Sequence, residues 1–259
     1  MTQVVSEIRK VATTWTWWLV LAAMAVYSGG FAAFTVLAST LERSPLQLGS
    51  PETVVVAYNV AIAVAYVFPL AMGVVVVTNE YRSKLIAQTL LANPSRWSVY
   101  GAKTVTGLGL GLLYSVVATA VCVGAGAGLL ALLGEPAYLT SAPVIGSLLG
   151  TVVALSLWGL IGVGVGALVR NQVVAVVGVL VLTQFVEPMA RSVVLGLSDS
   201  DVSWVLPGGA GDAAAGGTLY SMMNGVSADS QLPGFLMLGA YALVFCALGA
   251  WRFTRYEAA

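Results

Sequence analysis

Histidine is absent from this sequence of 259 residues. Without histidine the chain has no Ser/His/Asp or Cys/His catalytic group, no histidine-ligated zinc and no histidine proton relay. Cysteine is scarce as well, because Cys122 and Cys246 are the only two and both lie within apolar runs. We expect them to be small buried side chains rather than partners in a disulfide.

Charge is also in short supply. Only 8% of the residues are charged and 59% are apolar, with a mean hydropathy of +0.92. A soluble domain has roughly 45–50% apolar residues and about a quarter charged ones. The 11 basic and 11 acidic residues cancel, so the chain lacks the basic footprint of a nucleic-acid-binding protein. The composition predicts an integral membrane protein with the lipid bilayer as its partner and no nucleic acid.

Apolar runs long enough to cross a membrane are abundant. A spanning helix needs about 20 apolar residues. Six stretches qualify and predict an all-α integral membrane protein with one transmembrane domain over residues 1–259. They are Trp15 to Leu41, Thr53 to Thr78, Ala102 to Leu133, Pro143 to Val169, Val173 to Leu195, and Leu232 to Trp251.

The basic residues predict the orientation of these spans. With six spans both termini lie on one side, and that side carries Arg9, Lys10, Arg82, Lys84, Arg96, Lys103, Arg170, Arg252 and Arg255. Only Arg43 and Arg191 fall on the other side. The positive-inside rule therefore places both termini in the cytoplasm, and we expect the protein to lie in the cell inner (plasma) membrane. Residues 1–14 and 79–101 become cytoplasmic segments, and residues 196–231 an extracytoplasmic one.

Polar side chains within the spans are candidates for function, because a charge at mid-membrane costs at least about 2.5–3.5 kcal/mol. Asn59 in the second span and Gln184 and Glu187 in the fifth are the notable ones, and we expect them in the outer part of the membrane. They are candidates for a substrate pathway. The alternative for Glu187 is a local ion pair with Arg191, four residues later on the same helix.

Three further features predict local structure. Pro69 should bend the second span, either as a fixed bend or as a hinge, because proline removes a backbone hydrogen bond. Glycine pairs spaced four apart predict close helix contacts: Gly107 and Gly111, Gly124 and Gly128, Gly162 and Gly166. The outer segment 196–231 is too long for a turn, so it forms either short re-entrant or interfacial helices or an ordered external loop.

The stretch from Asn79 to Lys103 separates the second and third spans. It contains Gly101-Ala102-Lys103-Thr104, but it lacks the glycines of a phosphate-binding loop, so we expect no ATP site in this chain. Asn93 and Pro94 predict the cap and first turn of the third long helix. Residues 82–92 before them should form a short helical element whose apolar side chains point in several directions. Such an element suits a position between the membrane domain and a protein partner.

In this stretch and near its N-terminus, the chain resembles the type-2 ABC transporter permease family. The resemblance rests on Glu80-Tyr81-Arg82, Thr89 to Ala92, Pro94-Ser95-Arg96 and Lys103, with Ser6-Glu7, Arg9-Lys10 and Thr13 to Leu19 near the N-terminus. It implies a six-span half-transporter that pairs with a second permease subunit, identical or homologous. It also implies two copies of a separate ATP-binding subunit, which bind ATP and Mg, so this chain has no cofactor and is not itself an enzyme.

The resemblance also implies residue roles. The element after the second span would be a cytoplasmic coupling helix that inserts into the ATP-binding subunit. The residues implied for coupling are Glu80, Tyr81, Arg82, Lys84, Leu85, Ile86, Thr89 and Leu90. The substrate path would run between the second and fifth spans, where Asn59, Gln184 and Glu187 lie. The expected function is outward transport of a lipophilic or amphipathic substrate such as a drug, lipid or peptide.

Two other functions stay open from the residues alone. An ion-coupled secondary transporter would need a titratable group within the membrane, and Glu187 is the residue that fits. A lipid-modifying intramembrane enzyme is the third possibility, although the sequence offers no histidine and no cluster of acids at a cytoplasmic helix end.

Overall fold

The computed structural model describes residues 3–41, 46–83, 85–92, 95–197, 203–218 and 231–255. Within them, six helices are long and apolar enough to cross a membrane, which confirms the predicted all-α membrane protein with six spans. Their bounds are α2 Thr16–Ala38, α3 Pro51–Ala65 with α4 Val67–Arg82, α6 Arg96–Leu132, α7 Ala142–Val169, α8 Gln172–Val181 with η1 Leu182–Val186 and α9 Glu187–Leu197, and α12 Leu232–Thr254.

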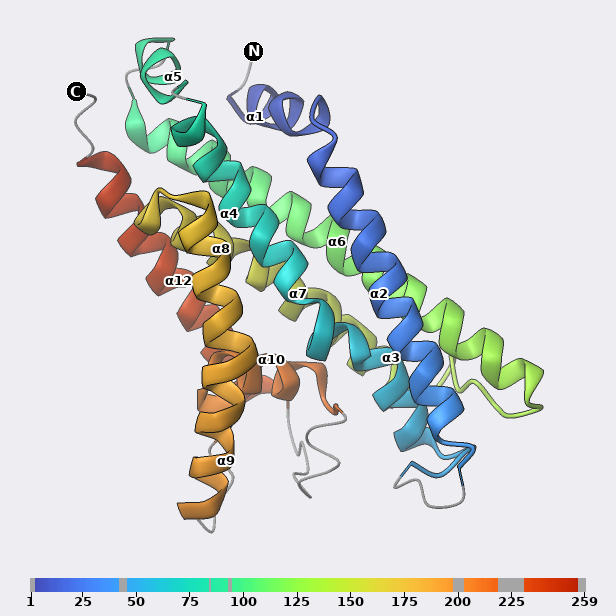
Figure 1. Cartoon of the computed structure of the whole chain (residues 1–259). Coiled ribbons are helices and arrows are strands. Elements are labelled where there is room, and N and C mark those ends of the chain that lie inside the picture. Colours follow the sequence, from blue (N-terminus) through green and yellow to red (C-terminus); the bar gives the residue numbers. More distant parts are fainter. Residues whose placement is uncertain are drawn as a thin grey trace.

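Shorter helices lie at the two ends of this bundle (Figure 1). One end carries α1 Gln3–Ala12, α5 Ile86–Ala92 and the C-terminal end of α12, and we call it the basic end. The opposite half of the bundle contains the 3-10 turn η2 Ser203–Val205 and α10 Pro207–Ala215, set in among the spans, and we call this half the α10 end. Both chain termini lie at the basic end. The assignment of this end to the cytoplasm remains a prediction of the positive-inside rule.

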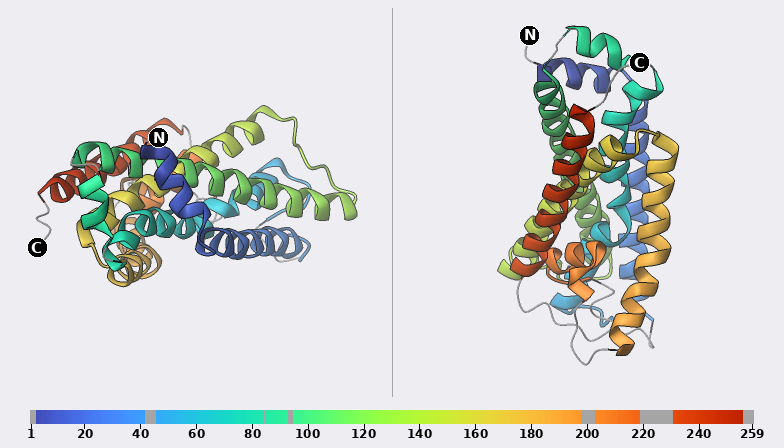
Figure 2. Two further views of the ribbon diagram at one scale, coloured as in Figure 1. Left: turned by 90° about the horizontal axis from the view of Figure 1, so that it is seen from above. Right: turned by 90° about the vertical axis from the view of Figure 1, so that its left-hand side faces the viewer.

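Helix α7 lies at the centre of the bundle and packs against α4, α6 and α12 (Figure 2). Its contact with α4 depends on glycine. A Cβ atom on Gly162 would lie 2.1 Å from the carbonyl oxygen of Leu70, and one on Gly73 would lie 2.1 Å from that of Gly159. The backbones therefore meet with no room for a side chain, as is common in membrane bundles.

The other two predicted glycine pairs differ from each other. A Cβ on Gly107 or Gly111 would also collide with α7, whereas a Cβ on Gly124 or Gly128 would meet nothing within 4 Å. Spacing alone therefore identified two pairs at close helix contacts and one pair that has none within the described residues.

Replacing Gly162 with alanine should lower the free energy of unfolding by about 1–3 kcal/mol or more, because α4 and α7 must separate to admit the methyl group. Gly128→Ala is the matched control on an open surface and should raise stability by up to about 1 kcal/mol through helix propensity. Unfolding of both variants in mixed micelles checks the difference. Equal stabilities would show that the α4–α7 contact is not as close as described.

Two of the spans are irregular. The second span is interrupted at Tyr66, between the last residue of α3 and the first of α4. Pro69 lies three residues later, where its missing N–H and its ring disfavour a continuous helix, so the predicted bend is confirmed. The fifth span contains the π-helical segment η1 between α8 and α9. Such π segments often occur at functional sites.

The turn before α6 differs from the prediction. Helix α4 continues through Arg82, and α5 begins only at Ile86, so the short helix is narrower than residues 82–92. Asn93 and Pro94, the predicted cap and first turn, lie outside the described residues. The cap of α6 is Ser95, whose hydroxyl accepts a hydrogen bond from the Ser98 N–H at 3.4 Å. Helix α6 thus starts at Arg96, six residues before Ala102, where the predicted third span begins.

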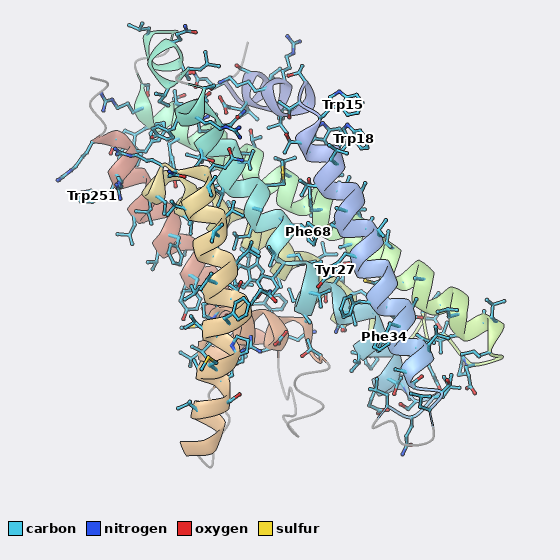
Figure 3. The ribbon with its side chains drawn as sticks, viewed as in Figure 1. Trp15, Trp18, Tyr27, Phe34, Phe68 and Trp251 are labelled. Atoms are coloured by element: carbon cyan, nitrogen blue, oxygen red, sulfur yellow. The ribbon has the colours of Figure 1, made fainter. Side chains whose placement is uncertain are left out.

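Aromatic side chains mark the basic end of the bundle. Trp15 and Trp18 on the first span, and Trp251 on the last, are exposed on this side of the molecule (Figure 3). Tryptophans of this kind concentrate at membrane interfaces. Tyr27, Phe34 and Phe68 lie further from this end (Figure 3). The distribution fits a bundle whose basic end emerges from the hydrocarbon near the three tryptophans.

Candidate functional site

Four charged side chains form a closed cluster at the basic end, which we call the charge cluster: Glu7 and Lys10 on α1, Glu80 on α4 and Lys103 on α6. Lys10 Nζ lies 2.6 Å from Glu7 Oε1 and 2.5 Å from Glu80 Oε1. Lys103 Nζ lies 2.8 Å from Glu7 Oε2 and 3.0 Å from Glu80 Oε2. Each carboxylate therefore contacts both ammonium groups, and the four charges sum to zero.

The cluster is mostly shielded from solvent. Lys103 is 0% exposed, and Glu7 and Glu80 are 5% exposed each. Burial acts to lower the pKa of Lys10, but its hydrogen bonds and proximity to Glu7 and Glu80 outweigh burial and raise that pKa, so the ammonium stays charged at neutral pH. A buried charge is tolerated only with such partners. The cluster therefore fixes α1, α4 and α6 relative to one another.

Helix α5 is attached to this cluster. The Thr89 hydroxyl donates a hydrogen bond to Glu80 Oε1 at 3.3 Å. Ile86 is buried in an apolar cluster with residues such as Val99 and Phe253. On the opposite side of α5 the Leu91 side chain is 85% exposed. The short helix thus has one side anchored in the bundle and an apolar side that faces outward, which explains apolar residues in several directions around it.

The remaining residues implied for coupling lie in different surroundings. Tyr81 is half-buried, with the Arg170 guanidinium 6.0 Å from its ring centre. Arg82 and Leu85 are exposed at the basic end. Lys84 lies outside the described residues. Leu90 belongs to α5, but its side chain is outside the description as well.

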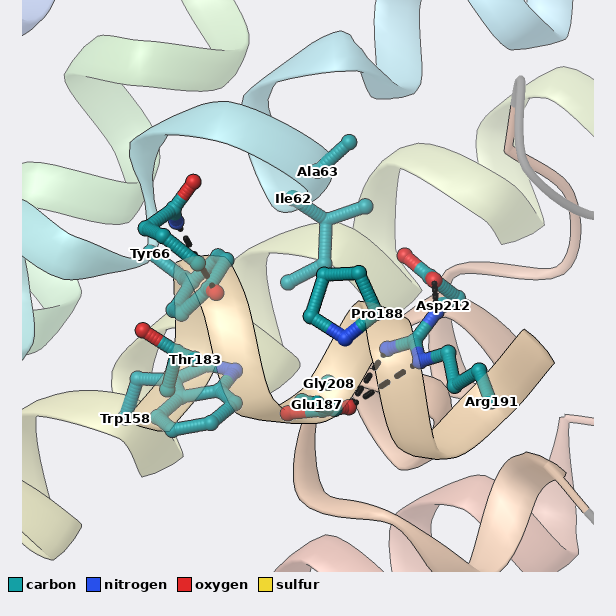
Figure 4. Close-up of a pocket in the computed structure, with 11 residues that line it drawn as sticks. Ile62, Ala63, Tyr66, Trp158, Thr183, Glu187, Pro188, Arg191, Gly208 and Asp212 are labelled. Carbon is teal, nitrogen blue, oxygen red and sulfur yellow. Dashed lines mark hydrogen bonds and ion pairs between the residues drawn. The ribbon is translucent and has the colours of Figure 1, made fainter. Parts of the chain in front are cut away.

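A second polar site lies towards the α10 end, in a pocket of about 170 Å³ between the second span, the fifth span, α7 and α10. Figure 4 shows Arg191 and Asp212 on one side of this pocket, Tyr66 and Trp158 on the other, and Glu187 between them. The Tyr66 and Trp158 rings lie 4.7 Å apart. The pocket therefore combines an aromatic wall with a charged one.

Arg191 connects two acids across this pocket. Its Nη2 lies 2.7 Å from Glu187 Oε1 and its Nη1 lies 2.6 Å from Asp212 Oδ2. The predicted pairing of Glu187 with Arg191 is therefore present, and it extends to α10. The Gly209 N–H also donates to Glu187 Oε1, at 3.0 Å. Burial raises the pKa of Asp212, while Arg191 acts in the opposite direction.

One carboxylate oxygen of the pocket differs from the rest. Glu187 Oε2 is buried and has no hydrogen-bond partner within the described part of the chain. Buried polar atoms are normally hydrogen-bonded, and an exception calls for an explanation. This oxygen is therefore an available acceptor in the wall of the pocket.

The two irregular spans meet at this pocket. The Gln184 amide, in the π-helical segment, donates to the Tyr66 hydroxyl at 3.1 Å, and Tyr66 occupies the interruption of the second span. Thr183 in the same segment donates to the Val179 carbonyl at 2.8 Å. Both irregular segments thus contribute side chains to one pocket. Segments with interrupted backbone bonding can change shape at lower cost than a regular helix.

Asn59 does not lie in this pocket. It is fully buried, and its amide nitrogen donates to Ser147 Oγ at 2.5 Å and to the carbonyls of Ala215 and Gly217. Its oxygen accepts from Thr151 Oγ1 at 2.9 Å. Asn59 therefore joins α3, α7 and the end of α10 and does not line the pocket with Gln184 and Glu187.

Sequence reasoning missed part of both sites. Glu7 and Lys10 were noted for the family resemblance, and Lys10 also for the orientation of the spans, but neither was predicted to be a partner of Glu80, and Asp212 was not singled out at all. The distance along the chain is the reason, because Lys10 and Glu80 are 70 residues apart and Lys103 and Glu7 are 96 apart. One signal was present: an isolated lysine in an apolar helix, such as Lys103, needs a buried acid from another segment.

The fold and the two sites define an all-helical, polytopic membrane protein with a buried charge cluster at one end and a polar pocket towards the other. No protein-family model and no curated protein matches the sequence.

Proposed function

We propose that this chain is the membrane-spanning subunit of an ATP-driven exporter, in which a separate ATP-binding protein docks on α5 at the cytoplasmic side. The observation that carries the proposal is the position of Glu80. Its carboxylate contacts Lys10 on α1, Lys103 on α6 and Thr89 on α5. A push on the outward side of α5 would therefore reach three other helices through one buried group.

The exposed apolar side of α5 supports the docking of a protein. Helix α5 lies at the extreme basic end (Figure 1), and Leu91 on it and Leu85 just before it are both exposed. Exposed leucines outside the hydrocarbon are typical of a surface that a partner covers. In the type-2 ABC transporter permease family, which the chain resembles, two ATP-binding subunits dock on two permease subunits. We extend that assembly to this chain. The ATP-binding partner would hold the ATP and Mg.

The pocket towards the α10 end supports a place for the substrate. It lies between the second and fifth spans, and its walls include both irregular segments. Closure of the ATP-binding subunits would shift α4 through Glu80, and α4 begins next to Tyr66 in the pocket wall. The transition is a population shift between two arrangements of packed helices. An aromatic wall with few polar groups suits a lipophilic or amphipathic substrate, exported outward.

An ion-coupled secondary transporter is the second candidate, because Glu187 is buried within a span and one of its oxygens has no partner within the described residues. Glu187→Gln separates the two functions. Transport into inside-out vesicles that also contain the ATP-binding protein should still require ATP and be reduced only several-fold, since glutamine keeps an oxygen for Arg191 and Gly209. Transport driven by an ion gradient without ATP, and abolished in this variant, would contradict the exporter.

A further inference from the structure

The Glu187 carboxylate is bound unequally at its two oxygens in the pocket towards the α10 end. Three donors converge on Oε1: Arg191 Nε at 3.1 Å, Arg191 Nη2 at 2.7 Å and the Gly209 N–H at 3.0 Å. Glu187 Oε2 accepts no hydrogen bond from the described residues, although the side chain is only 5% exposed. A buried charged oxygen is stable only with a hydrogen-bond donor beside it. A ligand of this pocket therefore needs a donor group.

Glu187 Oε2 faces the aromatic wall of the pocket. In Figure 4 the Glu187 oxygen that is not paired with Arg191 points to the side on which Tyr66 and Trp158 lie. These two rings are 4.7 Å apart and both are buried. Aromatic rings are favourable neighbours for a cation and for the apolar group that carries it. A positively charged donor would thus contact a carboxylate oxygen and two rings, and an anion would be repelled by the same carboxylate.

The charges of the pocket also favour a cation. The described lining contains two acidic side chains, Glu187 and Asp212, and one basic side chain, Arg191. Burial raises the pKa of Asp212 and outweighs the effect of Arg191, and the Glu187 carboxylate acts in the same direction as burial. A second negative charge is therefore unfavourable here. A positive charge bound beside Glu187 would act against both causes and balance the ionised side chains.

The oxygen ligands of the pocket suit an organic cation better than a divalent metal ion. Calcium and magnesium take about six to eight oxygen ligands. Within the described part of the chain, no group of three or more acidic or cysteine side chains could hold a metal ion. One carboxylate oxygen next to two aromatic rings is instead the surrounding that an ammonium group with an apolar body requires.

The size of the pocket limits what it can enclose. Its volume is about 170 Å³, whereas pockets for drug-sized ligands measure about 300–1,000 Å³. It can enclose an amine group and one ring. Gln184 and Pro188 line the pocket and are exposed on the fifth span, so the pocket opens at the side of the bundle. The remainder of a larger ligand can lie along the outside of that span.

We infer that this pocket binds the amine group of an organic monocation, which donates an N–H hydrogen bond to Glu187 Oε2 while its apolar part packs against Tyr66 and Trp158. As a statement about the exported substrate, the inference rests on the proposed function. It narrows the lipophilic or amphipathic substrates to primary and secondary ammonium compounds. A quaternary ammonium ion carries the charge but has no N–H for the carboxylate oxygen.

Four matched probes test the amine site on the full-length chain in phosphatidylcholine nanodiscs, with empty nanodiscs as the blank. 2-Phenylethylamine should bind about fivefold more tightly than 2-phenylethanol, because both partners of its hydrogen bond to Glu187 are charged. It should also bind several-fold more tightly than its N,N,N-trimethyl derivative, and 3-phenylpropionate should bind least. Ligand-observed NMR titrations measure the four affinities. Equal binding of the amine and the alcohol would refute the proposal.

The role of the carboxylate is tested by Glu187→Gln against Glu52→Gln. Both remove one negative charge, but Glu52 is exposed in the first turn of α3 and does not line the pocket. Glu187→Gln should lower the affinity for 2-phenylethylamine about fivefold, to that of the alcohol, and Glu52→Gln should leave it unchanged. Equal effects would show general attraction to acidic side chains and refute the site. Displacement of the amine by an equal concentration of sodium ion would assign the oxygen to a metal ion and would also refute it.

These titrations use neither ATP nor a partner protein, so they are independent of the proposed function. A chain that binds the amine but retains no ATPase would keep the amine site and contradict the exporter. A chain that retains the ATPase but binds the amine no better than the alcohol would keep the exporter and refute the amine site.

Discussion

Replacing Lys103 with methionine is expected to lower the free energy of unfolding by about 3–5 kcal/mol, the usual effect of removing one partner from a buried ion pair. Lys103 is 0% exposed and contacts Glu7 and Glu80. Methionine fills much of the same space, so packing is largely kept. Among the described residues, Lys10 would then be the one ammonium group left to the two carboxylates. Unfolding in mixed micelles measures the loss.

A double variant separates charge from packing. Lys103→Met combined with Glu80→Gln restores a neutral cluster of Glu7 and Lys10, and it should recover a large part of the lost stability, because replacing both partners of a buried pair is often close to neutral. The same double variant should still fail in the proposed transport, since residue 80, which is hydrogen-bonded to Thr89 on α5, no longer has an ionic contact with α6. A single variant as stable as the wild type would contradict the burial and pairing of Lys103.

Arg191→Met should have an effect of similar size at the other site, again about 3–5 kcal/mol. Arg191 is the cation that joins Glu187 on α9 to Asp212 on α10. Without it two shielded carboxylates repel each other across the pocket, and α10 loses its ionic contact with α9. We expect faster amide hydrogen exchange in α10 together with the lower stability.

Two further variants act as controls for Arg191. Arg191→Lys keeps the charge but cannot contact both Glu187 and Asp212, so we expect an intermediate loss in the free energy of unfolding. Arg191→Met with Glu187→Gln and Asp212→Asn removes all three charges and should recover most of the stability. If the single methionine variant left the exchange of α10 unchanged, the ion pair with Asp212 would have no part in holding that helix.

The spans themselves were predictable because the signal is local. About 20 apolar residues are needed to cross the hydrocarbon, and each of the six runs provides them. The bend near Pro69 and the pairing of Glu187 with Arg191 were predictable for the same reason, since both depend on residues within four positions of each other.

The two sites were only partly predictable. Glu80 was assigned to coupling only through the family resemblance, and its partners Lys10 and Lys103 follow only from the packing of α1 and α6. The π-helical segment leaves no clear pattern in the sequence, so the pairing of Gln184 with Tyr66 was not foreseen. Asn59 looked like Gln184 as an isolated polar residue, yet its environment is a closed set of hydrogen bonds.

Docking of an ATP-binding protein on α5 is tested most directly by co-purification with two matched leucine variants. Leu91 on α5 is 85% exposed, and Leu132 at the far end of α6 is 83% exposed. The tagged chain, solubilised from its native membrane, should retain a protein with measurable ATPase activity. Leu91→Asp should abolish that association and Leu132→Asp should preserve it. Retention of the ATPase by the Leu91 variant, or its absence from the wild type, would contradict the account.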